Sequence, residues 1–359
     1  MKFWDYKNID KNKMGSISQV AGIRHYEFAD GKAKGVEAVE IHTGSGLSFT
    51  VLPGRGMDIA WMQYRGVPVN YMSKTGIVSP AYYESESMNW LHNFFAGMLT
   101  TCGLLHVGGP EKVQHSVIGE RNYGLHGRIS NCAAEQVSTF EEWEDGEYVM
   151  KISGLMCEGI LHGEQLTLRR EITTKFGSKE FVLKDTVTNH DSKPQNTMLL
   201  YHINVGYPLL DANSRLIANS KEIAPQSDEA KAEMDSIFSC AEPVAGKTER
   251  CYAHDFDTDD KGMVKLAFAN DELELGLALE YKKSELPYFN QWKMQNTKEY
   301  VVGLEPGNCL PVGITKAEKN GMVDTILPDE KKTYEIVFKI LDGKEEIEKY
   351  EKEIFQKGR

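Results

Sequence analysis

The amino-acid sequence predicts a mainly β protein, built as one large antiparallel β-sandwich with a few short helices. Several runs alternate apolar and polar residues with a period of two, which is typical of strands with one buried face. The 32 glycines supply turns, and aromatic and β-branched residues recur in short runs. The chain shows no internal repeat, linker or break in composition, so residues 1–359 are expected to form a single domain.

The expected strands follow one another along most of the chain. The segments that favour strands are 35–42, 47–52, 148–152, 164–173, 181–189, 197–204, 263–269, 273–281, 300–305 and 333–341. The polar segment 190–194 is expected to turn strand 181–189 back on strand 197–204 as a hairpin. Segment 222–248 is acidic and weakly periodic, and we expect a loop there.

Two segments depart from this pattern and predict helices. Near residue 79, Ser79 can cap a helix that Pro80 begins, and apolar residues then follow at helical spacing as far as residue 99. These apolar residues are Trp90, Leu91, Phe94, Phe95 and Met98. They indicate one amphipathic helix, or two short ones, with an aromatic stripe that we interpret as core rather than ligand site. A terminal helix is expected from Lys344 onward, where Ile347, Tyr350, Ile354 and Phe355 have helical spacing.

The composition argues against several classes of function. The net charge is −12 without a basic block, so nucleic-acid and membrane partners are not expected. No apolar run approaches the about 20 residues that span a bilayer, and residues 1–6 lack the apolar stretch of a signal peptide. None of the six cysteines (Cys102, Cys132, Cys157, Cys240, Cys251 and Cys309) lies in a C-x-x-C pair. They are interpreted as thiols of a reducing compartment, so a cytoplasmic protein is expected.

Three polar segments in β-rich surroundings carry the candidate chemistry. Segments 125–129, 201–208 and 303–308 together offer two imidazoles, a carboxylate, an arginine and two amides. Proton transfer between sugar oxygens needs a general base, a general acid and groups that bind hydroxyls. These segments could supply all three kinds of group.

Strand alternation places His202 and Asn204 on one face, with Tyr201 on the other. Two polar side chains on one face indicate the floor of a polar cavity, or a core histidine bonded to a backbone carbonyl. His126 lies between glycines, which permit close approach to a ligand or a plain surface turn. Glu305 precedes Pro306, which is expected to break the strand and leave the carboxylate at a sheet edge. There it could act as a base with a raised pKa or pair with a lysine.

Support for a metal or a cofactor is weak. His106, His115, His126 and His202 do not have the H-x-H or H-E-x-x-H spacing of a metal site. The chain also lacks a P-loop, a G-x-G-x-x-G motif after a strand and a G-x-S-x-G motif. No metal and no cofactor are therefore expected.

The order of the motifs resembles the galactose mutarotase (aldose 1-epimerase) superfamily. The segment Asp185-Thr-Val-Thr-Asn189, followed by His202 and Asn204, resembles the family's central strand and catalytic histidine. Leu125-His126-Gly127 resembles its earlier histidine, and Glu305-Pro306-Gly307 its late glutamate. Short segments that resemble the sequences of a bacterial aldose 1-epimerase branch, DUF4432, occur at 53–59, 101–104, 125–129, 201–204 and 304–306.

This resemblance implies a β-supersandwich with a sugar cleft on one face. Glu305 would take the proton of the anomeric hydroxyl, and His202 would protonate the ring oxygen. The ring would then open, and reclosure after rotation would give the other anomer. His126 would bind a hydroxyl near the ring oxygen. The remaining residues expected to bind substrate are Arg55, Arg128, Asn204, Asn308, Trp292 and Asp255.

Three departures from the family pattern bear on the substrate. Arg128 stands where the family has a second glycine, which would favour an acidic or phosphorylated sugar, or would pair with a carboxylate. Arg55 is taken as the substitute for the family's arginine, and Asp255 for its aspartate. Trp292 would stack on a sugar face or pack in the core.

The leading hypothesis is an aldose mutarotase or epimerase that acts on a free sugar. One alternative is another sugar or keto-sugar isomerase or lyase on the same scaffold, and another is a non-catalytic sugar-binding protein. The expected partner is a small sugar, and assembly as a homodimer is left as an open alternative.

Overall fold

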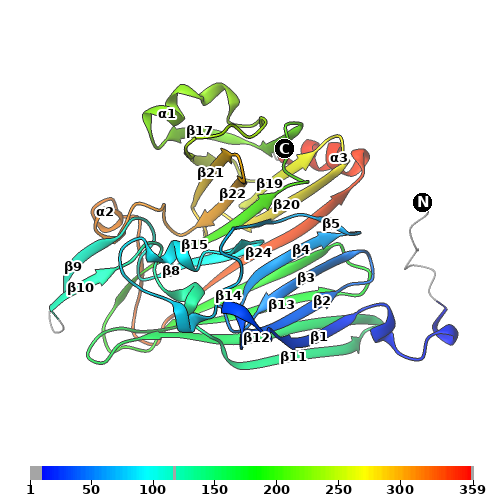
Figure 1. Cartoon of the computed structure of the whole chain (residues 1–359), viewed down its shortest axis with the longest axis horizontal. Coiled ribbons are helices and arrows are strands. Elements are labelled where there is room, and N and C mark those ends of the chain that lie inside the picture. Colours follow the sequence, from blue (N-terminus) through cyan, green and yellow to red (C-terminus); the bar gives the residue numbers. More distant parts are fainter. Residues whose placement is uncertain (1–9, 116–118, 357–359) are drawn as a thin grey trace.

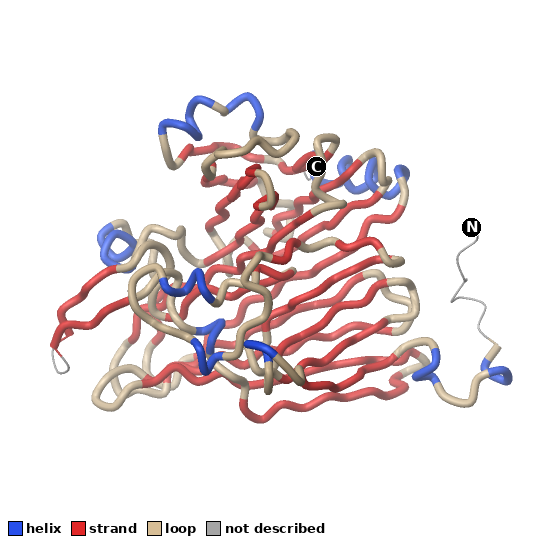
Figure 2. The backbone as a smooth tube through the Cα atoms, in the orientation of Figure 1, coloured by secondary structure: helices blue, strands red, loops and turns tan. Residues whose placement is uncertain are grey.

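The computed structural model describes residues 10–115 and 119–356 (Figure 1). Two large antiparallel sheets lie against each other, as the mainly β prediction requires. Strands are the predominant element of the backbone, and the helices are short (Figure 2). Within the described residues, no helix is long and apolar enough to cross a membrane.

The first sheet has 12 strands in the order β1-β2-β3-β4-β8-β15-β22-β21-β18-β17, with β5 beside β4 and β23 beside β15. Its strands are β1 (Gly22–Glu27), β2 (Glu37–His42), β3 (Leu47–Leu52), β4 (Asp58–Tyr64), β5 (Val67–Pro68), β8 (Leu99–Leu104), β15 (Gln195–Gly206), β17 (Ser220–Pro225), β18 (Arg250–Phe256), β21 (Tyr288–Asn296), β22 (Glu299–Gly307) and β23 (Asp324–Ile326).

The second sheet has eight strands in the order β11-β12-β13-β14-β24-β20-β19-β16. These are β11 (Glu135–Glu144), β12 (Glu147–Gly159), β13 (Gln165–Lys175), β14 (Glu180–Asn189), β16 (Ser214–Ala218), β19 (Met263–Asn270), β20 (Leu275–Lys282) and β24 (Lys331–Asp342). Two small sheets pair β6 (Tyr71–Met72) with β7 (Ala96–Gly97) and β9 (Glu111–His115) with β10 (Gly119–Tyr123).

Short helices connect the strands. They are α1 (Asp228–Ala232), α2 (Ile314–Lys319), α3 (Lys344–Phe355) and the 3₁₀ helices η2 (Lys11–Lys13), η3 (Ile17–Gln19), η4 (Gly31–Ala33), η5 (Pro80–Tyr82), η6 (Asn89–His92), η7 (Ile129–Asn131) and η8 (Met234–Ser236). Helix α3 confirms the predicted terminal helix, because Ile347, Tyr350 and Ile354 are its buried face.

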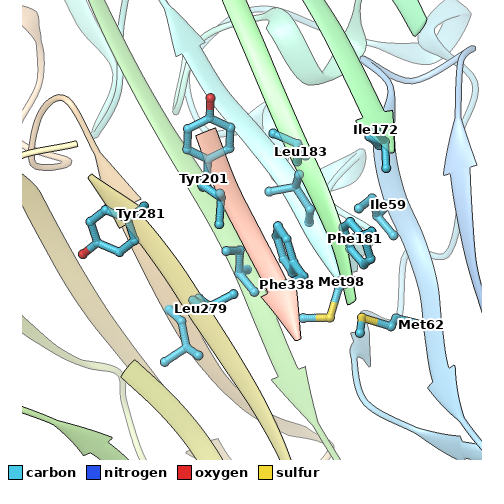
Figure 3. Close-up of a cluster of buried hydrophobic side chains, with 14 of the residues drawn as sticks. Ile59, Met62, Met98, Ile172, Phe181, Leu183, Tyr201, Leu279, Tyr281 and Phe338 are labelled. Carbon is cyan, nitrogen blue, oxygen red and sulfur yellow. The ribbon is translucent and has the colours of Figure 1, made fainter. Parts of the chain in front are cut away.

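The main hydrophobic core lies between the two large sheets (Figure 3). Phe181 of β14 stacks on Phe49 of β3 at 4.3 Å between ring centroids and on Phe338 of β24 at 4.7 Å. Strand β15 contributes Tyr201 and Ile203 to this core. Its alternate residues therefore face away from the core, as the sequence predicted.

A buried polar network also joins the sheets. The guanidinium of Arg170 on β13 binds both carboxylate oxygens of Asp185 on β14, at 2.8 and 2.6 Å, and Asp58 on β4 at 3.1 Å. The Tyr201 hydroxyl donates to Asp185 at 2.9 Å. These side chains are fully buried, so each charge depends on its partners inside the protein.

The predicted hairpin between segments 181–189 and 197–204 is wrong. Strand β14 pairs with β13 and β24 in the second sheet, whereas β15 pairs with β8, β22 and β23. The polar segment between them carries the chain from one sheet to the other. Asn189 holds this crossing, because its amide donates to Lys193 O and Ile326 O.

Two further predictions need correction. Residues 79–99 contain two short helices, η5 and η6, which is one of the two predicted arrangements, but both are 3₁₀ helices and no single amphipathic α-helix forms. Ser79 caps η5 as expected, and after η6 the chain continues into β7 and β8. Ser87, Ala96 and Gly97 have φ values of 52°, 63° and 65°, which break a right-handed helix. The expected loop 222–248 contains the end of β17, helix α1 and η8.

Candidate active site

A cavity of about 670 Å³ lies on the face of the first sheet that points away from the main core. Its floor is made by His202 of β15 and by alternate residues of two neighbouring strands, which are Asn290, Trp292 and Met294 of β21 and Glu299, Val301 and Glu305 of β22. Segments near β6, η6 and His126 line the rest. The volume falls within the usual range for small-molecule sites, about 300–1,000 Å³.

His202 and Glu305 lie opposite each other on neighbouring strands. The pairs Leu200↔Gly307 and Ile203↔Leu304 fix the register of β15 and β22, and this register sets His202 against Glu305. Such cross-strand neighbours share one face of the sheet. The His202 Nε2 atom lies 3.3 Å from Glu305 Oε1. Antiparallel pairing alone therefore brings an imidazole and a carboxyl together.

Pro306 does not end the strand, contrary to the prediction. Strand β22 continues to Gly307, and Phe289 of β21 pairs with Pro306. The ladder to β15 records no pair at Glu305 or Pro306, and proline has no N–H to donate there. Glu305 thus lies inside the sheet, where only 2% of it is exposed, rather than at an edge.

Asn290 holds the other oxygen of the carboxyl. It pairs with Glu305 across β21 and β22, and its Nδ2 donates to Glu305 Oε2 at 2.7 Å. No role was predicted for Asn290 from the sequence. The signal that could have found it is its alternation with Trp292, which places both side chains on the cavity face.

Gly303 provides the space that the Glu305 side chain occupies. A Cβ atom at this position would lie 2.5 Å from Glu305 Oε1 and 3.1 Å from Trp292 Cβ. Any side chain there would displace the carboxyl or the indole. Gly303 begins the polar segment 303–308 of the sequence, but its role as a space for the carboxyl follows only from the packing.

His126 reaches the cavity from a tight turn. Its φ is 56° and that of Gly127 is 75°. A Cβ on Gly127 would lie 2.4 Å from Gly103 O, so the glycine permits a close backbone approach. The His126 ring lies 6.2 Å from that of His202 and 4.9 Å from Trp90.

Aromatic rings enclose His202. The ring of Phe94 lies 5.1 Å from the imidazole and that of Trp292 lies 5.2 Å from it. The indole Nε1 of Trp292 donates to Glu249 Oε2 at 2.7 Å, which fixes its orientation. Trp90 and Phe94 are buried, as predicted for a core stripe, but together with Leu91 they line the cavity.

Burial shifts the pKa of all three central groups toward their neutral forms. It lowers the pKa of His202 to about 4, against a smaller opposing effect of Asn204. Burial and the nearby His202 lower the pKa of His126 to about 3. Burial raises the pKa of Glu305 to about 8, although the hydrogen bond from Asn290 opposes this. At neutral pH the floor of the cavity therefore carries little charge.

Several buried polar atoms around the floor have no hydrogen-bond partner among the described residues. These atoms are His126 Nδ1, His202 Nδ1, Asn290 Oδ1 and Glu305 Oε1, the last of which lies 3.3 Å from His202 Nε2 without hydrogen-bond geometry. Buried polar groups normally find partners, and their clustering around one cavity indicates a polar ligand.

Three residues expected to bind substrate serve the fold instead and do not line the cavity. The guanidinium of Arg55 is fully buried and donates to the carbonyls of Val78, Asn93 and Ser130. The amide of Asn204 donates to Ala96 O and His202 O. Asn308 accepts from Leu199 N at 2.6 Å. Each satisfies backbone groups that are buried, which sequence alone does not separate from substrate binding.

Two other expected residues also lie outside the cavity lining. Arg128 is exposed, so it does not bring a positive charge to the floor. Asp255 lies on β18 and forms an ion pair with Lys283. Of the nine residues assigned from the sequence, the structure brings Glu305, His202, His126 and Trp292 together around one cavity.

The described residues contain no group of three or more His, Cys, Asp or Glu side chains arranged to hold a metal ion. His106 is engaged with Gly109 O at 2.7 Å and with the backbone N–H of Ile314 at 3.3 Å. The side chain of His115 lies outside the described part of the chain.

The fold is that of galactose mutarotase-like proteins. Residues 33–340 match the model of the domain of unknown function DUF4432, and the chain belongs to that family. No curated protein matches it significantly.

Solved structures show the same fold. A candidate aldose 1-epimerase from Klebsiella pneumoniae is 25% identical, with a TM-score of 0.86 over 92% of this chain and 86% of the other. A galactose mutarotase-like protein from Clostridium acetobutylicum is 12% identical, with a TM-score of 0.65 over 90% and 99%. Galactose 1-epimerase from Lactobacillus acidophilus is 12% identical, with a TM-score of 0.60 over 90% and 99%.

Proposed function

We propose that this protein is an aldose mutarotase in which Glu305 and His202 form the acid–base pair. The observation that carries the proposal is their 3.3 Å contact at the floor of a cavity large enough for a sugar. The unpartnered polar atoms around this contact support a ligand with many hydroxyl groups. The similarity to the Klebsiella pneumoniae protein supports the same reaction class.

The reaction needs one proton removed and one proton delivered. The Glu305 carboxylate takes the proton of the anomeric hydroxyl, and the bond between C1 and the ring oxygen breaks. Its electron pair stays on the ring oxygen, which receives a proton from His202, while C1 becomes an aldehyde. Rotation about C1–C2 and reversal of these steps give the other anomer, so no atom is gained or lost.

The pair holds the single proton that this reaction needs. Between the pKa of His202, about 4, and that of Glu305, about 8, the two groups together carry one proton. Burial favours the neutral carboxyl and the neutral imidazole. Transfer of the proton across the contact gives the carboxylate base and the imidazolium acid without exchange with solvent.

His126 and Asn290 would bind hydroxyls of the substrate. His126 Nδ1 and Asn290 Oδ1 lack partners among the described residues, and both residues line the cavity. The neutral form of His126, favoured by its pKa of about 3, can accept a hydrogen bond. Arg128 is not part of the lining, and Lys74, which is, is already paired with Glu299, so we propose an uncharged sugar rather than an acidic or phosphorylated one.

NMR anomer exchange on a panel of aldoses tests this function. We expect one or more neutral sugars to exchange anomers faster with the protein than without it. A product of changed constitution would instead identify a keto-sugar isomerase or lyase. Binding without any turnover would identify a sugar-binding protein. Either of these results would overturn the mutarotase proposal.

A further inference from the structure

We propose that the preferred substrate is a reducing disaccharide, with its second ring in an outer subsite formed by Tyr71, Met294 and Val301. This inference rests on the proposed function, because it takes the reacting ring to lie over His202 and Glu305. It concerns the part of the cavity that the acid–base pair does not reach.

The cavity is longer than one sugar ring. Glu299, Val301 and Glu305 all line the cavity. They lie on the same face of β22, because an even number of positions separates each from the next. Six residues of an antiparallel strand span about 20 Å at roughly 3.4 Å per residue. A single ring at Glu305 covers only the inner part of this length, so the outer part is left for a further group.

The walls of the outer part are apolar. Met294 pairs with Val301 across β21 and β22, and Tyr71 of β6 also lines this region. Strand β6 lies close over the sheet here, because a Cβ on Gly206 would be 2.6 Å from Tyr71 Cα. Gly206 in turn pairs with Val301. Val301 is fully buried, so Tyr71 and Met294, which are partly exposed, present the apolar surface that suits the face of a sugar ring.

Polar groups close the outer end. Lys74 Nζ lies 2.5 Å from Glu299 Oε1, and Asn296 Nδ2 donates to Glu299 Oε2 at 2.9 Å. Lys74 and Glu299 both line the cavity, and the Lys74 side chain is 75% exposed and therefore within reach of a ligand. Apolar walls with charged donors and acceptors at one end match a ring that carries hydroxyls. An alkyl chain would make no use of the exposed Lys74 ammonium, whereas a hydroxyl can hydrogen-bond to it.

The test compares reducing disaccharides with their reducing-end monosaccharides on the same protein. The probes are a panel of neutral reducing disaccharides and their reducing-end monosaccharides, followed by NMR anomer exchange and by saturation-transfer binding. We expect kcat/KM for at least one disaccharide to exceed that of its monosaccharide by about tenfold or more. Turnover of the monosaccharides with no binding of any disaccharide would overturn the inference.

Two variants locate the effect. Val301 is fully buried beneath the outer part, so Val301→Phe should push Tyr71 or Met294 into it and lower the disaccharide-to-monosaccharide ratio of kcat/KM by about tenfold. Circular dichroism checks that this variant folds. Lys74→Ala removes an exposed side chain with little risk to folding and should lower the same ratio. Leu273→Phe, at a surface position remote from the cavity lining, is the matched control and should leave the ratio unchanged. An unchanged ratio in both test variants would place the second ring elsewhere and contradict the subsite.

The binding measurement distinguishes a failure of the outer subsite from a failure of the proposed mutarotase function. If no sugar exchanges anomers but a disaccharide binds and Val301→Phe weakens that binding, the mutarotase function fails and the outer subsite stands. If monosaccharides exchange anomers and disaccharides do not bind, the function stands and the subsite fails.

Discussion

At the scale of single residues, the site depends on one row of side chains across three strands. His202, Glu305 and Asn290 lie side by side on β15, β22 and β21, so the backbone ladder fixes their separations. Motif order predicted His202 and Glu305 from the sequence. It did not predict Asn290 or the space at Gly303, because both act through neighbours that only the register defines.

Substitution of Gly303 tests whether the position of the carboxyl matters. Gly303→Ala should lower kcat by about 100-fold, since displacement of a catalytic group by about 1 Å has an effect of this size. The matched control is Gly159→Ala on β12, where a Cβ would meet no atom closer than 3.5 Å. Circular dichroism checks that both variants fold. Full activity in Gly303→Ala would show that Glu305 does not need its present position.

Asn290 sets the alkaline limb of the pH profile. Its hydrogen bond stabilises the ionised form of Glu305 and so lowers the pKa of that carboxyl. Wild-type kcat/KM should fall below about pH 4 and above about pH 8, where the pair holds two protons or none. In Asn290→Leu the lost hydrogen bond should move the alkaline limb to higher pH. A limb that stays in place would contradict this role.

At the scale of elements, strand β15 joins the core to the site. Its odd-numbered residues pack between the sheets, and Tyr201 belongs to the Arg170–Asp185 network. The next residue along, His202, faces the cavity. The period-two pattern predicted both faces correctly. It could not predict that β14 and β15 belong to different sheets, because a polar turn has the same composition in a hairpin as in a crossing between sheets.

The buried network should contribute strongly to stability. Asp185→Ala leaves Arg170 with Asp58 as its remaining carboxylate partner, and loss of one partner of a buried ion pair costs about 3–5 kcal/mol. Urea unfolding measures the change in the free energy of unfolding. The matched control is Asp271→Ala, which removes an exposed partner of Arg215 and should cost less than about 1 kcal/mol. Equal effects of the two substitutions would contradict this account.

At the scale of the whole molecule, the sequence predicted the β-sandwich, most of its strands and the terminal helix. Strand periodicity and turn residues are local signals, and they were sufficient for this. The conformation of residues 79–99, part of which lines the cavity, was not predicted correctly. The apolar residues of this segment have helical spacing, but the backbone is left-handed at Ser87, Ala96 and Gly97, and the spacing does not reveal this. Arg55 and Asn308 lie outside the cavity lining for a different reason, because their side chains bind backbone groups that are distant in the sequence.

The buried carboxyl of Glu305 should make stability depend on pH. Folding raises its pKa from about 4.5 to about 8, so its favourable contribution is present below pH 4.5 and is lost as the pH rises through 8. Glu305→Gln has no proton to lose in this window. The Tm difference between Glu305→Gln and wild type should therefore grow in favour of the variant between pH 5 and about pH 8. A Tm difference that is constant across this range would contradict the buried, raised pKa.

The central claim is that Glu305 and His202 exchange the anomers of a sugar. The most direct measurement is NMR anomer exchange by wild type, Glu305→Gln and Glu335→Gln on the best sugar of the panel. Glu335 is an exposed carboxylate on β24 and serves as the matched control. The account predicts that Glu305→Gln loses at least about 100-fold in rate, the scale of general acid–base catalysis, while Glu335→Gln keeps the wild-type rate. Full exchange activity in a folded Glu305→Gln protein would contradict it.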